Sequence, residues 1–366
     1  MMDYREKLKV EKGTAFVLAI VMTLAAFFFA TLLKSDEDTP LSNVIRLNTS
    51  TNREVQVSGQ YVFYLEAGSL HCVNAAGSYI WNLGVDSDSH FQATDHGVAV
   101  WSRKKITVVE RETGHVLATK TMESDVLTAC VGETYVAAVL GPENESNIAL
   151  MTLSGAMVDT IDSFHGYTVL DCGFFEGREL FWMMTLDSSG SVPTCRISTF
   201  IPGKRETGSI MDYEQVIYQV MFRSSFIEAV GTNYMRLYDY TGQEHKDGRV
   251  TVYGWYLESV DKRTDDPLML FVPNRQVEGE RAIRDVRMMH GGEEKIIHLP
   301  ISCERLEASG LNLYGFSQNH LAVHTFGNVK TTVYDFPVTV DTVIGITSDN
   351  TAVVTSGGAI FMVRLP

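Results

Sequence analysis

The stretch "SLHCVNAAGSYIWNLGV", Ser69 to Val85, contains the pattern that decides the fold. Apolar residues alternate with other residues up to Asn74, the chain turns at Ala76-Gly77, and a second alternating run carries Trp81. Alternation with a period of two, interrupted by a turn that contains glycine, is typical of a β-hairpin. The stretch is therefore predicted to form two antiparallel strands.

The same pattern recurs along the chain and predicts a repeat. Further hairpins begin at residues 97, 134, 179, 224, 267, 319 and 351. The glycines expected in the second turn of six units, at 77, 114, 155, 208, 242 and 292, are about 43 residues apart on average, which is the spacing of propeller blades. One more apolar strand separates most hairpins, which makes four strands per unit. Radial stacking buries both faces of such sheets, so the fold class is predicted to be all-β, a single β-propeller.

The number and closure of the blades also follow from the sequence. Residues 43–366 would supply about 40 residues to each of eight blades or about 46 to each of seven, and we favour eight, with seven as the alternative. The last unit stops at Arg364 after three strands, and "NVIRLN", Asn43 to Asn48, precedes the first unit as a strand without a partner. This N-terminal strand is expected to complete the last blade.

An apolar segment precedes the repeats. Gly13 to Leu33 is 21 residues without a charge and would span about 31 Å as a helix. It is longer than the apolar region of a cleaved signal peptide, and Phe28 and Ala30 make a poor cleavage site. We therefore expect a cytoplasmic tail (1–12), a transmembrane helix (13–33), a linker (34–42) and an extracytoplasmic propeller (43–366).

Charges around this helix predict its orientation. Arg5, Lys7, Lys9 and Lys12 precede it, whereas Asp36, Glu37 and Asp38 follow it. Since basic residues favour the cytoplasmic side, the predicted location is the cell membrane, single-pass, with the C-terminal domain outside. The net charge of −15 argues against nucleic acid as a partner, because phosphate contacts need clustered Lys and Arg.

Motifs that could carry chemistry are weak. "SRKK", Ser102 to Lys105, matches S-x-x-K but falls in a hairpin tip, and "DSDSH", Asp86 to His90, lacks the glycine of a calcium loop. His320 and His324 would be about 13 Å apart on a strand, too far apart to share a metal. No catalytic residue, cofactor or metal ligand is assigned.

The five cysteines are widely spaced and form no C-x-x-C motif, so neither a zinc site nor a dense disulfide framework is indicated. Cys130 and Cys172 fall in corresponding strands, which leaves one disulfide between them open.

"SLHCVNAAGSYIWNL" resembles the quinoprotein-type (PQQ-like) propeller repeat. The matching residues are Leu70, Asn74, Ala75, Gly77 and Trp81. The resemblance implies that Trp81 packs between neighbouring blades. Quinone-dependent dehydrogenases of this type carry an adjacent cysteine pair and a calcium ion held by acidic and amide side chains, and no two cysteines are adjacent here. In its organisation, the whole chain also resembles an uncharacterised family of membrane-anchored extracytoplasmic propellers of Gram-positive bacteria, which brings no catalytic residues.

Three long connections between the second and third strands of their blades, at 141–147, 187–193 and 273–281, are expected on one rim of the ring. Long loops on one rim favour partner binding, and tolerated insertion is the alternative. The candidate partner-binding residues are Pro142, Glu143, Asn144, Asp187, Ser188, Pro193, Asn274, Arg275 and Glu278.

The functional hypothesis is a non-enzymatic, membrane-tethered scaffold that binds a protein, or a cell-wall component, outside the membrane. The alternative is a quinone-dependent oxidoreductase or a hydrolase with its site in the central channel. That alternative predicts acidic side chains that converge in the channel.

Overall fold

The computed structural model describes residues 41, 43–50, 54–142, 146–162, 167–175, 179–191, 193–223, 226–264, 266–274 and 282–366. These residues form 32 strands, and none of their elements is an apolar helix that could cross a bilayer. The predicted cytoplasmic tail and transmembrane helix lie outside the described residues, as does most of the linker.

The strands form eight antiparallel sheets of four strands each. In chain order, the first four blades are β2 (Val55–Ser58), β3 (Tyr61–Glu66), β4 (Ser69–Asn74) and β5 (Tyr79–Gly84); β6 (His90–Ala93), β7 (Val98–Ser102), β8 (Lys105–Val109) and β9 (Val116–Thr121); β10 (Val126–Val131), β11 (Tyr135–Leu140), β12 (Asn147–Thr152) and β13 (Met157–Asp162); and β14 (Tyr167–Phe174), β15 (Phe181–Asp187), β16 (Thr194–Ile201) and β17 (Arg205–Asp212).

The other four blades are β18 (Ile217–Arg223), β19 (Phe226–Gly231), β20 (Tyr234–Asp239) and β21 (Glu244–Thr251); β22 (Trp255–Val260), β23 (Met269–Pro273), β24 (Ile283–His290) and β25 (Glu293–Cys303); β26 (Arg305–Ser309), β27 (Asn312–Phe316), β28 (His320–Thr325) and β29 (Thr332–Asp335); and β30 (Thr342–Ile346), β31 (Thr351–Ser356), β32 (Ala359–Arg364) and β1 (Val44–Ser50).

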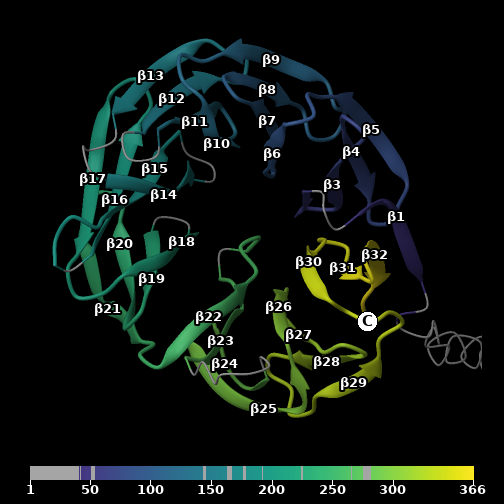
Figure 1. Ribbon diagram of the computed structural model, residues 1–366. Helices are drawn as coiled ribbons and strands as arrows, with labels where there is room; N and C mark the ends of the chain where they lie inside the picture. Colours follow the sequence, from purple (N-terminus) through teal and green to yellow (C-terminus); the bar gives the residue numbers. More distant parts are fainter. Residues whose placement is uncertain are drawn as a thin grey trace, which may run out of the picture.

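The sheets follow one another around a central axis, with the first strand of each blade innermost (Figure 1). The all-β propeller with eight blades is therefore confirmed. Its closure is confirmed as well, because β1 pairs antiparallel with β32, with Val44 opposite Val363. The N-terminal strand thus supplies the outermost strand of the last blade.

Apolar side chains fill the spaces between neighbouring blades. One cluster joins Ile106 of the second blade to Val136 and Met151 of the third, and all three are fully buried. Inner strands such as β11, "YVAAVL", are buried on both faces, which is why they are nearly continuous apolar runs. Burying one such Val, Ile or Met side chain contributes about 1.5–3 kcal/mol to stability.

One expected turn glycine is placed differently. Gly208 lies within β17, and the turn before that strand contains Gly203, at φ +74°. The prediction for Gly208 was wrong because this glycine allows a close approach between the fourth and fifth blades. A Cβ there would stand 2.3 Å from the carbonyl oxygen of Tyr240 in the next blade. Only glycine leaves room for that backbone.

Trp81 lies against the neighbouring blade. Its indole Nε1 donates a hydrogen bond to the carbonyl oxygen of Arg111, 2.8 Å away, in the turn between β8 and β9. A Cβ on Gly114, in the same turn, would be only 2.6 Å from the indole ring. The side chain of Trp81 therefore contacts the second blade while belonging to the first.

Candidate functional site: the loop face

One face of the ring carries two kinds of connection, those between the second and third strands of a blade and those between consecutive blades. Backbone hydrogen bonds join the two kinds. After the first blade, the amide of Val85 donates to the carbonyl oxygen of Gly68 over 2.8 Å. After the fifth blade, the amide of Val252 donates to the carbonyl oxygen of Asn233 over 2.8 Å. We call this surface the loop face. Its described residues are 54, 67–68, 85–89, 103–104, 122–125, 141–142, 146, 188–191, 193, 213–216, 232–233, 252–254, 274, 282, 304, 317–319, 336–341 and 357–358.

The sequence-predicted binding residues that are described lie on this face or at the strand ends that border it. They are Pro142 in the third blade, Asp187, Ser188 and Pro193 in the fourth, and Asn274 in the sixth. The other candidates, Glu143, Asn144, Arg275 and Glu278, fall outside the described residues. Three different blades thus supply the described candidates.

Two exposed tyrosines that the sequence reasoning missed lie on the same face. Tyr213 is 67% exposed in the connection before the fifth blade, and Tyr253 is 76% exposed in the connection after it. A tyrosine in a short loop gives no sequence signal of its own, because the pattern does not show how far its ring protrudes. Exposed tyrosines are frequent contributors to protein–protein binding.

Hydrogen bonds join these tyrosine loops into one surface. Asn233 lies between them, and its side-chain Nδ2 donates to the carbonyl oxygen of Glu214 over 3.1 Å. On the other side, the amide of Asn274 donates to the carbonyl oxygen of Gly254 over 2.9 Å. We call Tyr213, Asn233, Tyr253 and Asn274 the tyrosine patch.

A buried glutamine holds the patch in place. The side-chain oxygen of Gln215 accepts hydrogen bonds from the amides of Asn233 (3.1 Å) and Tyr234 (2.7 Å), and its Nε2 donates to Asp212 over 2.9 Å. A Cβ at Gly231 would stand 2.3 Å from the Gln215 amide carbon, so this packing requires glycine. The loop that carries Tyr213 is thereby fixed before any partner binds, which lowers the entropy cost of binding.

The loop face is acidic. Its described connections between consecutive blades contain no lysine or arginine. They contain the acidic residues Glu54, Asp86, Asp88, Glu123, Asp125, Glu214, Glu304 and Asp341. Two of these carboxylates have basic partners: Asp88 pairs with Arg103 at 3.2 Å, and Asp86 pairs with Lys105 at 3.6 Å. A potential of one sign over such a surface favours partners of opposite charge.

The opposite face surrounds one end of the central channel. We call it the channel face; it is formed by the connections between the first and second strands of each blade. A cavity of about 390 Å³ lies there. Asp95 is the only carboxylate among the described residues that line it, and its Oδ1 is 2.7 Å from Arg111 and 3.4 Å from Ser58. Among the described residues, the lining therefore does not provide the clustered acidic ligands of a calcium site.

The described residues contain no group of three or more His, Cys, Asp or Glu side chains placed to hold a metal ion. His320 and His324 both lie on β28 and have different partners, Asp335 and Thr331. Ser102 to Lys105 forms the tip between β7 and β8, as expected.

All five cysteines are buried free thiols. Cys130 and Cys172 are neighbours across the joint between the third and fourth blades, and the hydrogen bond between their thiols, together with burial, raises the pKa of Cys172 well above its ordinary value. Burial raises the pKa of Cys72 and of Cys303 to about 12. A raised pKa leaves Cys72, Cys172 and Cys303 as neutral thiols, which are poor nucleophiles.

Comparisons with known proteins bear on the fold. No family model and no curated protein matches the chain. Solved structures that are similar to it include BamB from Moraxella catarrhalis (11% identity, TM-score 0.55, covering 89% of this chain and 99% of that one), Sqt1 from Saccharomyces cerevisiae (9%, 0.59, 89% and 100%) and the WD40 domain of SCAP from fission yeast (8%, 0.54, 88% and 98%). At these identities the likeness shows that the chain has the β-propeller fold.

Proposed function

We propose that the chain is a non-enzymatic, membrane-tethered scaffold whose loop face binds a protein partner outside the membrane. The observation that carries the proposal is the tyrosine patch, in which two exposed aromatic side chains are held on a preorganised surface. Interface hot spots are enriched in tyrosine and cluster in this way. The candidate loops in the third, fourth and sixth blades border the same surface.

The charge of the loop face supports a partner with a basic surface. Acidic residues populate the described connections between blades, and Glu123 and Asp125 are exposed there. Opposite potentials accelerate encounter and disfavour wrong partners. We therefore expect lysine and arginine side chains on the partner, around apolar groups that contact Tyr213 and Tyr253.

The path of β1 supports a tether on the side opposite the loop face. The hydroxyl of Thr49, near the end of this strand, donates a hydrogen bond to the carboxylate of Glu66 at the loop-face end of β3. Val44, at its start, is opposite Val363 near the end of β32, so β1 begins on the side of the ring that carries the channel face. A nine-residue linker reaches about 30 Å at most. In the proposed arrangement the loop face points away from the bilayer.

In-cell crosslinking of the tagged full-length chain, followed by mass spectrometry, tests the proposal. Proteins recovered with the wild type should be lost with Tyr213→Ala/Tyr253→Ala. They should be retained with Tyr240→Ala, because Tyr240 is 42% exposed in the turn between β20 and β21, away from the loop face. Recovery of the same proteins with the wild type, the double variant and Tyr240→Ala would contradict the proposed binding face.

A further inference from the structure

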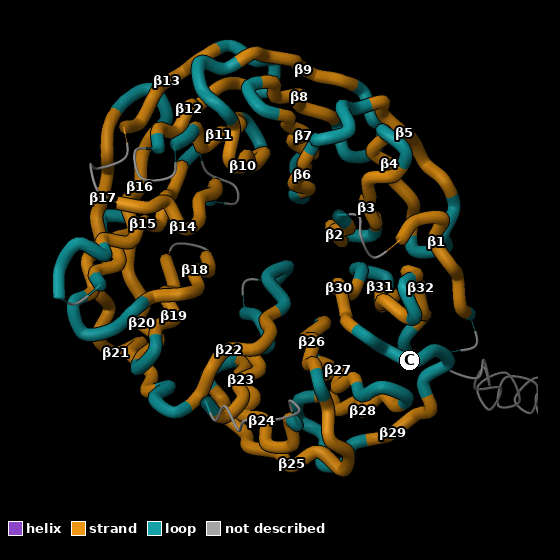
Figure 2. Tube along the Cα trace, viewed as in Figure 1, coloured by secondary structure: helices purple, strands orange, loops and turns teal. Residues whose placement is uncertain are grey.

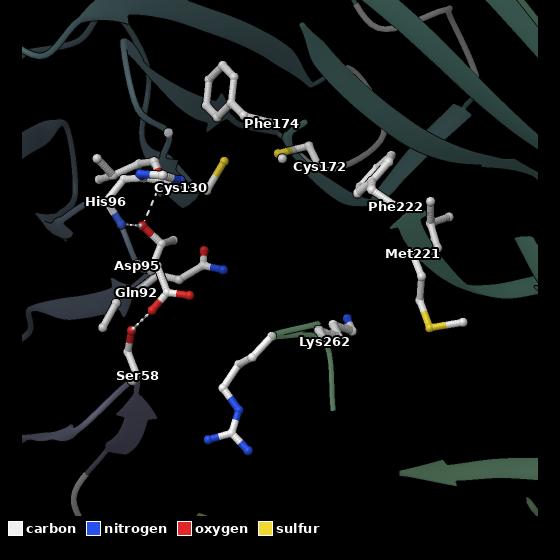
Figure 3. A pocket seen from close by; sticks show the side chains of 18 of the residues that line it. Ser58, Gln92, Asp95, His96, Cys130, Cys172, Phe174, Met221, Phe222 and Lys262 are labelled. Atoms are coloured by element: carbon white, nitrogen blue, oxygen red, sulfur yellow. Dashed lines mark hydrogen bonds between the residues drawn. The ribbon is translucent and has the colours of Figure 1, made fainter. Parts of the chain in front are cut away.

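The cavity at the channel face has a polar side and an apolar side. Figure 3 shows Asp95, Gln92 and Ser58 on one side, and Phe222 and Met221 on the other. The volume of about 390 Å³ is in the lower part of the range of small-molecule pockets. An apolar wall facing a few polar groups is the usual composition of such a site.

Lys262 reaches this cavity from the connection that follows β22, which extends toward the axis of the ring (Figure 2). Both of its neighbours are fixed. Asp261 accepts a hydrogen bond from the amide of Gly310 over 2.6 Å, and Arg263 donates to Asp261 (2.6 Å) and to Ser309 (2.9 Å). The seventh blade therefore holds the segment that presents Lys262.

The charge of Lys262 lacks a contacting partner within the described part of the chain. Its ammonium group has no hydrogen bond there and no acidic oxygen within 4.0 Å. Lys262 is exposed at the surface of the cavity; nearby protein atoms lower the pKa of its ammonium, and the charge of Asp171 offsets this in part. The other charged groups that line the cavity differ, because Arg263 contacts Asp261 and Asp95 contacts Arg111.

The apolar wall is well packed. The ring of Phe222 lies 4.2 Å from that of Phe175 and 5.3 Å from that of Trp182, measured between centroids. Phe174 covers Gly132, where a Cβ would be 2.6 Å from its ring. Met221 is almost fully buried beside Phe222. This wall can accept an aryl or short alkyl group without rearrangement.

We propose that the channel cavity binds a small organic anion, with its acidic group on the ammonium of Lys262 and its apolar body against Phe222 and Met221. An incoming anion would supply the hydrogen bonds that Lys262 lacks, and a hydrogen bond between two charged groups is stronger than one between neutral groups. This site is on the face opposite the tyrosine patch, so it does not depend on the proposed protein binding.

Fluorine NMR on the full-length chain in detergent tests this assignment. The probes are para-trifluoromethylbenzoate, the corresponding sulfonate and the corresponding benzylamine, each titrated against protein and against empty micelles. The anions should bind saturably, and the amine at least about tenfold more weakly.

The variants remove or keep the positive charge at position 262. Lys262→Met should weaken anion binding by at least about tenfold, and Lys262→Arg should retain most of it. Lys204→Met is the matched control, because Lys204 is an exposed lysine in the turn between β16 and β17, outside the cavity. Equal binding of anion and amine, full anion affinity in Lys262→Met, or no saturable binding of either anion would overturn the proposal.

Discussion

The indole Nε1 of Trp81 and the carbonyl oxygen of Arg111 form a 2.8 Å hydrogen bond that joins the first blade to the second. Around it, the turn at Gly114 lies so close to the indole that no Cβ fits. The bond and the close contact together make this joint sensitive to small changes on either side.

Substitutions at this joint should destabilise the ring in a graded way. Trp81→Phe removes the hydrogen bond and should cost about 0.5–1.5 kcal/mol of unfolding free energy, whereas Trp81→Ala also removes the packed ring and should cost about 3–5 kcal/mol. Gly114→Ala forces a Cβ into the indole at φ +72° and should also destabilise. Urea unfolding measures all three, and equal stability of wild type and Gly114→Ala would show that the close contact is not maintained.

Features that depend on residues close together in the sequence could be predicted, whereas contacts between blades could not. The strand and turn pattern around Trp81 is local, so the blade repeat, the blade number and the closing strand could be predicted correctly. Gly208 shows the limit. Its Thr-Gly pair looks like a turn, but the structure uses this glycine for an approach of Tyr240 from the next blade, which no local pattern encodes.

The candidate site could be predicted only in part for the same reason. Loop length points to the connections that carry Pro142, Ser188 and Asn274. The tyrosine patch depends on hydrogen bonds between blades, such as that from Asn274 to Gly254, and on how far Tyr253 protrudes. These are properties of the folded ring.

Gln215 should be essential for the geometry of the patch. Gln215→Ala leaves the amides of Asn233 and Tyr234 without their acceptor, and leaving a buried donor unpaired costs about 1–3 kcal/mol each. Gln243 lies in the turn between β20 and β21, where its backbone amide donates to Asp239, away from this network, so Gln243→Ala is the control. Hydrogen exchange should accelerate at residues 213–216 and 232–234 in Gln215→Ala alone; unchanged protection there would contradict the supporting role.

The contribution of Asp261 to stability should depend on pH. Burial alone would raise the pKa of Asp261, but hydrogen bonds from Arg263 and from the amide of Gly310 outweigh burial and hold the pKa below its ordinary value. Because the folded-state pKa is the lower one, the stabilisation is fully present above the unfolded-state pKa of about 3.9 and is lost as pH falls through the folded-state pKa.

Asp261→Asn should therefore lower the unfolding free energy by about 1–3 kcal/mol at pH 7, and the difference from wild type should shrink once the pH falls below about 4. Urea titrations at several pH values measure the difference. A difference that stays constant down to pH 3, while both chains remain folded, would show that the carboxylate charge of Asp261 is not the stabilising feature.

The proposed location can be tested through the cysteines. All five native thiols are buried, so the folded chain should react slowly with maleimides. Ser87 is exposed on the loop face, and Ser87→Cys adds a single accessible thiol. In intact cells, a membrane-impermeant maleimide should label Ser87→Cys and leave the wild type unlabelled. Labelling of Ser87→Cys only after cell lysis would contradict an extracytoplasmic propeller.

The most direct test of the scaffold proposal is site-specific photo-crosslinking in living cells, with a benzophenone amino acid at position 253 and, as the control, at position 240 in the fifth blade. We expect a discrete crosslinked protein from position 253, weakened by Gln215→Ala and by high salt, and none from position 240. Crosslinks from position 240 alone, or the same products from both positions, would contradict the loop face as the binding surface.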